Sequence, residues 1–390
     1  MKKISAVVFL AFLLLSFLNA QDRNPGRTPI RSRYYEVYAA EDMGKAVSDE
    51  LESRFDVYNR LFRFDPALLP APLRVRVFYD KAEYDAYITA RLGSSRPGAV
   101  YLHYNQPDRR ELIIHQNSSE KDRMLPHQAF IQYLRGFVPY PPAWMREGFS
   151  IYFNTLKYSR TGSNAGALSY EENLSWLETV KSQADNLPSL ESVLLADTMG
   201  APDHFQSFSW ALVSFFLNSG NTDYFRTLVE CIMLLSPNAT AAENSQAVKR
   251  RIDLWIKRDA FDADCVSYFK ARKTFAELIA EGEAAYNAKE KVDAELSFLA
   301  ALIQRPSHYA PYYYLGLLAY EDKNYEAAEQ YYRSSLEYGG DKALVSYALG
   351  INAASAGRNA DAVSYLQQAA AASPDRYKAR AERLIERLIK

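Results

Sequence analysis

Residues 309–340 have the sequence YAPYYYLGLLAYEDKNYEAAEQYYRSSLEYGG, one unit of a pattern that returns every 34 residues in the last third of the chain. Small residues recur at two positions of the pattern, which are Gly282, Gly316, Gly350 and Ala294, Ala328, Ala362. A large side chain fills a third position and Pro or Gly a fourth, namely Phe298, Tyr332, Leu366 and Pro306, Gly340, Pro374. Small residues let two helices approach closely, and Pro or Gly ends a helix. Each unit therefore predicts two amphipathic helices joined by a tight turn, stacked on the next unit as an all-α solenoid.

The pattern closely resembles the tetratricopeptide repeat (TPR). In consensus order the second unit has Tyr312, Leu315, Gly316, Ala328, Tyr332 and Leu336, with Gly340 in place of the usual Pro. Three such units cover residues 275–374. Residues 375–390 combine one apolar stripe with charged residues elsewhere, which predicts a C-terminal capping helix with a polar outer face.

Stacked repeats of this kind form a superhelix with a concave face. The resemblance implies that this face carries six helix residues: Ile279, Tyr286, Tyr313, Leu317, Tyr320 and Tyr347. Four tyrosines in a groove could hold an extended peptide or a partner helix, so we expect a protein or peptide partner there. Two alternatives stay open. The groove could pack on the chain's own N-terminal domain, or some tyrosines could only fill gaps between repeats.

The N-terminal half predicts an α+β domain. Strands are expected at 31–39, 73–79, 99–104 and 111–115, because these segments are apolar or alternate in polarity. Helices are expected at 41–62 and 81–92, and a long helical section follows from about 119. Further helical patterns at 205–217, 222–235 and 241–257 complete the domain. A mixed order of strands followed by helices is typical of the α+β class.

Two neighbouring helical segments carry the residues that matter for chemistry, LPHQAFIQYL at 125–134 and PPAWMREGFSIYF at 141–153. The second is similar to the segment P-x-W-x-x-E-G-x-x-x-Y-F of gluzincin peptidases of the peptidase MA-like group. That resemblance covers about 28–262 and implies a zincin-like (thermolysin-like) fold. In those enzymes a preceding helix bears H-E-x-x-H. The resemblance implies that His127 matches the first zinc ligand and Gln128 the general base. It likewise implies that Ile131 matches the second ligand and Glu147 the third.

Two of these four positions have lost their chemistry. An amide such as Gln128 cannot deprotonate a metal-bound water, and the hydrocarbon of Ile131 cannot bind zinc, which usually takes three protein ligands. We therefore expect a degenerate metallopeptidase domain with no catalytic residue and no cofactor. His127 would be an ordinary cleft or buried histidine, and Glu147 would satisfy buried donors or pair with an arginine such as Arg146. One alternative is an active zinc enzyme with an atypical ligand set that recruits His115 or His204. Another is a domain that only supports the repeats.

The N-terminus predicts export. Lys2 and Lys3 precede an apolar run from Ile4 to Leu18, and the small residue Ala20 follows, which is the layout of a signal peptide over residues 1–20 with cleavage after Ala20. The run of about 15 residues is short for a bilayer span, although an uncleaved anchor remains an alternative. We expect a periplasmic or secreted protein without a membrane span after cleavage. Whether Cys231 and Cys265 form a disulfide stays open.

Charge and composition narrow the function. Lys plus Arg number 46 and Asp plus Glu 47, for a formal net charge of −1, so no charge excess indicates binding to nucleic acid or to an anionic membrane. With 48% hydrophobic and 24% charged residues the chain has an ordinary globular composition. The sequence as a whole predicts an exported, non-catalytic protein that binds or scaffolds another protein.

Overall fold

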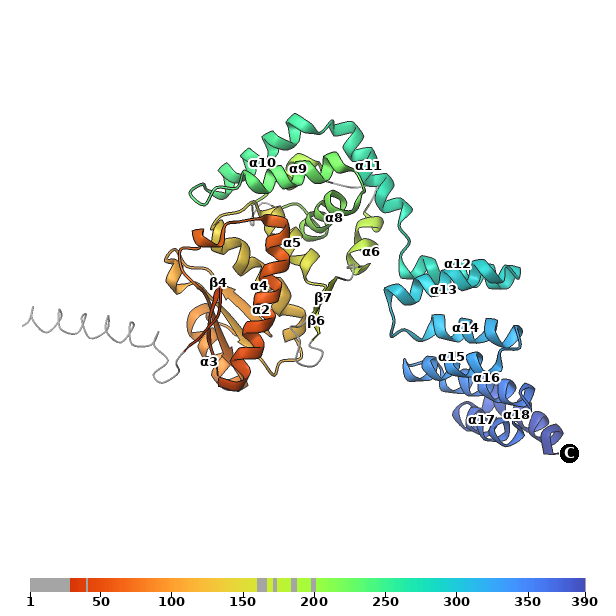
Figure 1. The fold of residues 1–390 in the computed structure, drawn as a ribbon. Helices are drawn as coiled ribbons and strands as arrows, with labels where there is room; N and C mark the ends of the chain where they lie inside the picture. The colour runs from red at the N-terminus through yellow and green to blue at the C-terminus, as the bar shows by residue number, and fades with distance from the viewer. Residues whose placement is uncertain are drawn as a thin grey trace, which may run out of the picture. The chain divides into compact units, whose positions relative to one another are not determined.

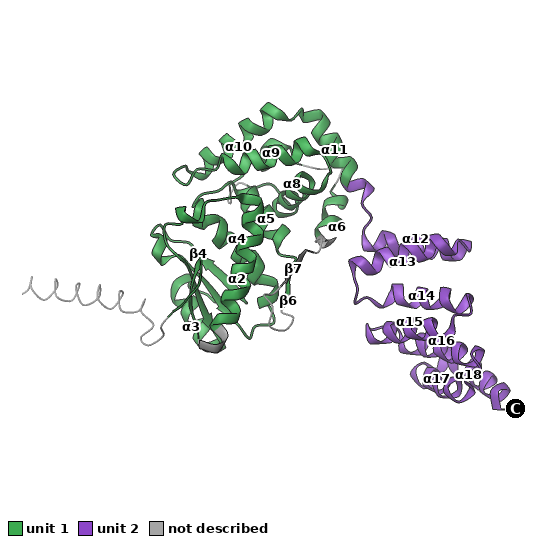
Figure 2. Ribbon diagram, in the orientation of Figure 1, with its two compact units in different colours: residues 1–268 green, residues 269–390 purple. Residues whose placement is uncertain are grey.

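The computed structural model describes residues 29–39, 41–159, 167–170, 174–183, 188–197 and 201–389. The predicted signal peptide lies outside these residues. The chain divides into two compact units, Met1–Tyr268 and Phe269–Lys390, which Figure 2 colours separately. Unit 1 is a mixed α/β region with a five-stranded sheet, and unit 2 is a series of paired helices (Figure 1). Among the described helices none combines the length and apolarity that a membrane crossing needs.

The sheet of unit 1 has the strand order β1-β2-β3-β5-β4. Its strands are β1 (Ile30–Arg31), β2 (Tyr35–Tyr38), β3 (Leu73–Phe78), β4 (Ala99–Leu102) and β5 (Glu111–His115). The three central strands β2, β3 and β5 run parallel, and β1 and β4 pair antiparallel at the two edges. In this register Val75 lies opposite both Val37 and Leu112. The predicted strands at 73–79, 99–104 and 111–115 are thus confirmed to within two residues.

Helices cover both faces of the sheet. Side chains alternate along β3, so Leu73, Val75 and Val77 share one face and Arg74, Arg76 and Phe78 the other. The first face packs against α4 (Lys121–Phe137), where Leu73 contacts Gly136, and α2 (Glu41–Phe62) lies beside α4. The second face packs against α3 (Lys81–Leu92). Aromatic rings of α2 and α4 form the core between them, among them Tyr58 with Phe130 (5.2 Å) and Phe55 with Tyr133 (5.0 Å).

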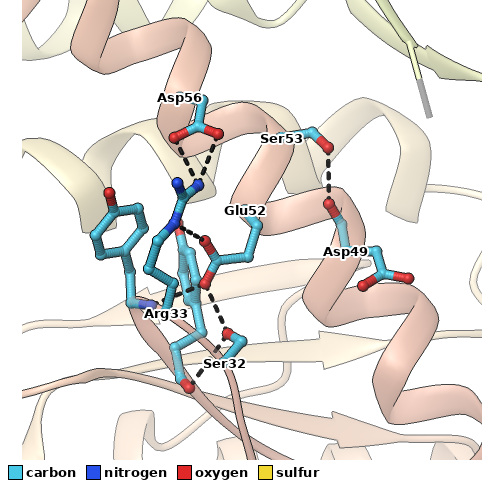
Figure 3. Close-up of polar contacts among 8 residues, drawn as sticks. Ser32, Arg33, Asp49, Glu52, Ser53 and Asp56 are labelled. Atoms are coloured by element: carbon cyan, nitrogen blue, oxygen red, sulfur yellow. Dashed lines mark hydrogen bonds and ion pairs between the residues drawn. The ribbon is translucent and has the colours of Figure 1, made fainter. Parts of the chain in front are cut away.

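The predicted strand at 31–39 is wrong at its centre, because residues 32–34 form a turn between β1 and β2. Glu52 of α2 holds this turn: its carboxylate accepts from the Ser32 hydroxyl at 2.7 Å and from the Tyr34 N–H at 2.8 Å (Figure 3). The Arg33 guanidinium reaches the same helix and pairs with Asp56 at 2.7 Å. These polar bonds to a distant helix replace the ladder bonds that a continuous strand would make.

The remaining helices of unit 1 follow the sheet. The predicted ones are α5 (Ala143–Phe153), α8 (Phe205–Asn218), α9 (Thr222–Met233) and α10 (Ala241–Trp255). The sequence did not predict the hairpin β6 (Leu156–Ser159) and β7 (Ala167–Tyr170), the helices α6 (Leu174–Ser182) and α7 (Leu190–Leu194), or the short turns of 3-10 helix at Pro66–Leu68 and Pro107–Arg109. Helix α11 (Arg258–Ala271) contains the boundary between the units. Cys231 and Cys265 are both free thiols.

Unit 2 consists of helix pairs with the predicted period. They are α12 (Phe275–Ala288) with α13 (Lys291–Gln304), α14 (Tyr309–Glu321) with α15 (Tyr325–Glu337), and α16 (Lys342–Ser355) with α17 (Asn359–Ala372), followed by α18 (Pro374–Ile389). A Cβ on Gly282, Gly316 or Gly350 would lie 2.5–2.7 Å from the large side chain of the paired helix, Phe298, Tyr332 or Leu366. Left-handed backbone at Lys289, Lys323 and Gly357 ends the first helix of each pair at the same interval. The small residues therefore do what the sequence predicted, since they let each pair close.

Candidate functional site

The four residues that the resemblance aligns with the peptidase site, His127, Gln128, Ile131 and Glu147, are called here the peptidase-like positions. Helices α4 and α5 bring two of them, His127 and Glu147, within electrostatic range of each other. His127 lies near the start of α4, directly after Pro126, which is inside the helix and does not end it. Its Nε2 lies 3.4 Å from the hydroxyl of Ser150 in α5, and that hydroxyl donates to the carbonyl of Glu147 at 2.8 Å. Since the single hydroxyl proton of Ser150 is used in this way, the contact is satisfied when His127 Nε2 carries the proton.

Burial is the main influence on His127. It lowers the pKa of the imidazole, and the carboxylate of Glu147 partly opposes this while the guanidinium of Arg146 adds to it. The histidine is therefore biased toward the neutral form, although it faces a carboxylate. The opposing signs of Glu147 and Arg146 show that His127 lies within electrostatic range of both.

Gln128 contacts the sheet. Its Oε1 accepts the backbone N–H of Tyr101 at 3.0 Å. Tyr101 lies in β4, an edge strand, so this N–H has no strand partner on its outer side. Gln128, which the resemblance to gluzincins aligns with their general base, thus provides an acceptor for an N–H of the sheet edge that has no strand partner. Its amide has no basic site that could take a proton from water.

Ile131 lies one turn after His127 on the same side of α4 and is half-buried. Glu147 is engaged elsewhere: the guanidinium of Arg146 donates to its Oε1, from Nε at 2.9 Å and from Nη2 at 2.8 Å. A charge-assisted pair of this kind satisfies the carboxylate without metal. The pairing of Glu147 with Arg146 is one of the structural roles that the sequence suggested.

A zinc ion does not fit these residues. Zinc needs an unprotonated imidazole nitrogen and usually two further protein ligands, yet His127 directs Nε2 at Ser150, Ile131 is a hydrocarbon and Glu147 is paired. No group of three or more His, Cys, Asp or Glu side chains in the described ranges is arranged to hold a metal.

The two spare histidines do not complete a ligand set around His127. His115 packs on the opposite face of the sheet, where its ring stacks on Tyr84 of α3 at 5.3 Å between ring centroids. The proposal of His115 as a third ligand is therefore wrong. His204 comes immediately before α8 and lines a pocket of about 430 Å³ together with Glu147, Trp176 and Phe205. That pocket is the concave space beside the peptidase-like positions.

Gly148 of the Glu-Gly pair has a packing role. A Cβ at this position would overlap with the backbone carbonyl of Ser209, since α5 and α8 cross there at very short range. Trp144, Phe149 and Phe153 of the same helix are buried in the core. The motif that resembles a peptidase segment is thus also what a helix needs to pack in this position.

The six groove residues of unit 2 are all half-buried. The Tyr286 hydroxyl donates to Glu321 of the next pair at 2.8 Å. The Tyr320 hydroxyl lies 3.2 Å from that of Ser355, again one repeat further on, and the ring of Tyr347 lies 5.0 Å from that of Tyr377. Ile279, Tyr313 and Leu317 pack against the cores between helices. Part of each side chain therefore joins neighbouring repeats, and part remains accessible.

The sequence reasoning missed an exposed apolar stripe on α13. The stripe consists of Val292, Leu296, Leu299 and Ile303, which are 69%, 60%, 39% and 83% exposed. The spacing of four, three and four residues puts them on one side of the helix. One repeat later the same positions hold Glu326, Gln330, Arg333 and Glu337, so the repeat itself does not require apolar residues there. Comparison of the units position by position would have revealed the stripe.

The last helix, α18, lies where the capping helix was expected. Tyr377 and Ala381 are buried against the preceding pair, whereas Leu384, Ile385 and Leu388 are only half-buried. A groove of about 720 Å³ lies between α17 and α18, and Ala371, Ala381 and Ile385 are among the residues that line it.

No protein-family model matches the sequence, and a search of the curated proteins finds no match to it.

Proposed function

We propose that the chain is a peptidase-like protein without hydrolytic activity, joined to a tetratricopeptide-type solenoid, and that it acts by binding another protein. The first twenty residues support action outside the cytoplasm, in the periplasm or as a secreted protein. Neither zinc nor nucleic acid has a part in the function that we propose.

The observation that carries the proposal is that two of the peptidase-like positions are occupied by hydrogen bonds and an ion pair within the protein. Gln128 bonds the edge strand at Tyr101, and Glu147 is paired with Arg146. Both side chains are thus engaged in bonds within the protein. A catalytic base, in contrast, must be free to take a proton, and a zinc ligand must be free to bind the metal.

Partner binding is supported by the surface of unit 2. The accessible parts of Tyr313 and Tyr320 offer aromatic contact area at low entropic cost. The exposed stripe of α13 is a second apolar surface, and contiguous exposed apolar patches are typical of interaction sites. We expect the concave face to hold the partner, because its tyrosines combine rings with hydroxyl groups.

The test is a comparative capture experiment with the full-length mature chain and an envelope extract. We expect the double variant Tyr313→Ala/Tyr320→Ala to lose a protein that the natural chain retains. Tyr320→Phe is the matched control, because it removes only the hydroxyl that faces Ser355 and keeps the ring.

A second pair of substitutions, Leu296→Gln and Ile303→Gln, tests the stripe. If only this pair loses the partner, the concave face is not the binding site. If all variants retain the same proteins, binding through unit 2 is contradicted. Circular dichroism of each variant must show unchanged helix content for the comparison to count.

A further inference from the structure

One half-buried side of α4 extends beyond the peptidase-like positions. His127, Ile131 and Arg135 follow at intervals of four residues and therefore lie on the same side of the helix. All three are partly exposed, whereas Phe130 and Leu134 between them are buried. At 1.5 Å per residue, Arg135 lies about 12 Å along the axis from His127.

Arg135 and the neighbouring Arg110 bind only backbone oxygens. Arg135 donates from Nε to the carbonyl of Pro139 at 2.9 Å. Arg110 is buried and donates to the carbonyls of Tyr104, Asn105 and Arg135, at 2.8, 3.3 and 3.2 Å. In the part of the chain that the structure describes, no carboxylate pairs with either guanidinium. The terminal nitrogens of Arg135 have no acceptor there either.

Three other arginines of unit 1 with little exposed side chain are each paired with a carboxylate within 3.2 Å: Arg54 with Glu50, Arg76 with Glu111 and Arg146 with Glu147. Removing a charge from water without a counter-charge is costly. Arg135 and Arg110, at the end of α4, differ from these three, because backbone carbonyls and not a carboxylate accept their hydrogen bonds.

The electrostatics agree with an uncompensated site. Burial lowers the pKa of Arg135 to about 10, and the charges of Arg146 and Arg110 add to this, whereas the hydroxyls of Tyr101 and Tyr140 act in the opposite direction. Burial also lowers the pKa of His103, to about 3, and the charges of Arg135 and Arg110 add to this effect. At neutral pH Arg135 is therefore charged, and His103 is neutral with a buried Nε2 that has no hydrogen-bond partner among the described atoms.

We propose that Arg135, supported by Arg110, binds an oxyanion at this end of α4, and that the oxyanion is the C-terminal carboxylate of a peptide lying along the half-buried side of the helix. The two terminal nitrogens of Arg135 remain free to donate, and a pair of guanidinium N–H groups matches the two oxygens of a carboxylate. This inference deepens the proposed function, since it rests on a peptide or protein as the ligand. Inorganic phosphate shares the same oxyanion chemistry and is the competing source.

The experiment uses calorimetric titration of the full-length mature chain with three probes. These are N-acetyl-tetra-alanine with a free C-terminal carboxylate, the same peptide as its C-terminal amide, and inorganic phosphate at matched ionic strength. We expect the acid to bind about ten- to a hundredfold more tightly than the amide, which is the range for hydrogen bonds to a charged group. Arg135→Met removes this preference, and Arg135→Lys, which keeps the charge but loses the fork, reduces it.

Arg123→Met, on the exposed side of the same helix, is the matched control and should leave binding unchanged. Thermal unfolding without ligand separates a binding role from a structural one. Arg135→Met loses the hydrogen bond to the Pro139 carbonyl but also removes a charge that lies near two like charges, so its free energy of unfolding should change by less than about 1.5 kcal/mol. A loss well beyond that of a single hydrogen bond would show that Arg135 has a structural role and contradicts the proposal.

Equal binding of acid and amide overturns carboxylate recognition. Binding of phosphate alone overturns the peptide as its source. The capture experiment tests the proposed function separately, because its variants lie in unit 2.

Discussion

Gly148 shows how a single residue can satisfy a family pattern for a reason of packing alone. Its backbone lies against the carbonyl of Ser209, where α8 crosses α5, and there is no room for a side chain. A sequence can show that a glycine is present. It cannot show which distant backbone segment requires it.

We predict that Gly148→Ala lowers the free energy of unfolding by about 1–3 kcal/mol, the usual cost of overpacking. Urea denaturation measures it. Gly136→Ala is the control in the neighbouring helix, since its Cβ would meet only the ends of the Leu73 and Leu69 side chains. Leucine ends can move, and alanine favours the helix over glycine, so Gly136→Ala should be neutral or slightly stabilising. Equal losses at both positions would show that α5 and α8 do not cross as described.

The chemical content of the site could be predicted at the residue scale, and its contacts could not. The identities of Gln128 and Ile131 already exclude a base and a ligand at their positions. That Gln128 bonds Tyr101 of β4 depends on which strand becomes the sheet edge. The two neighbouring guanidinium groups of Arg110 and Arg135 could not be predicted, because the two residues lie in different segments of the sequence and come together only in the folded chain.

Among the elements, β3, β5 and α3 are joined by a buried ion pair. Arg76 of β3 donates to Glu111 of β5 at 3.2 Å, both side chains are almost fully buried, and the Tyr87 hydroxyl of α3 donates to the same carboxylate at 2.6 Å. Breaking such a pair leaves an unpaired buried charge, which is strongly destabilising.

We therefore predict that Glu111→Gln costs about 3–5 kcal/mol of unfolding free energy. Glu120→Gln is the comparison, because its pair with Arg123 is exposed and should contribute less than about 1 kcal/mol. Chemical denaturation of both variants decides the matter. If the two losses are similar, the network between sheet and helix is not formed.

Elements were predictable where their periodicity was long. The helices α2 and α3 and the 34-residue pairs of unit 2 agree with the expected ranges, because many residues repeat one pattern. The segment 31–39 was wrong because Glu52 of α2 bonds the turn residues. The hairpin β6–β7 was missed because its four-residue strands carry too little pattern to distinguish them from a loop.

At the scale of the whole molecule, the two units follow from different kinds of information. Unit 2 is visible in the sequence through its period alone. Unit 1 is a mixed α/β region, and its combination of strands and helices was predictable from the order of the segments. The proposal that it is a degenerate peptidase rests on one short motif and on the residues that depart from it. The function proposed for the chain depends on that departure.

The most direct test of this account is the zinc content of the purified mature chain after mild dialysis, measured together with its hydrolysis of unstructured peptides. We predict far less than one zinc per chain, no hydrolysis, and no change in either value in His127→Ala. One bound zinc per chain, lost together with peptidase activity in His127→Ala, would contradict the account.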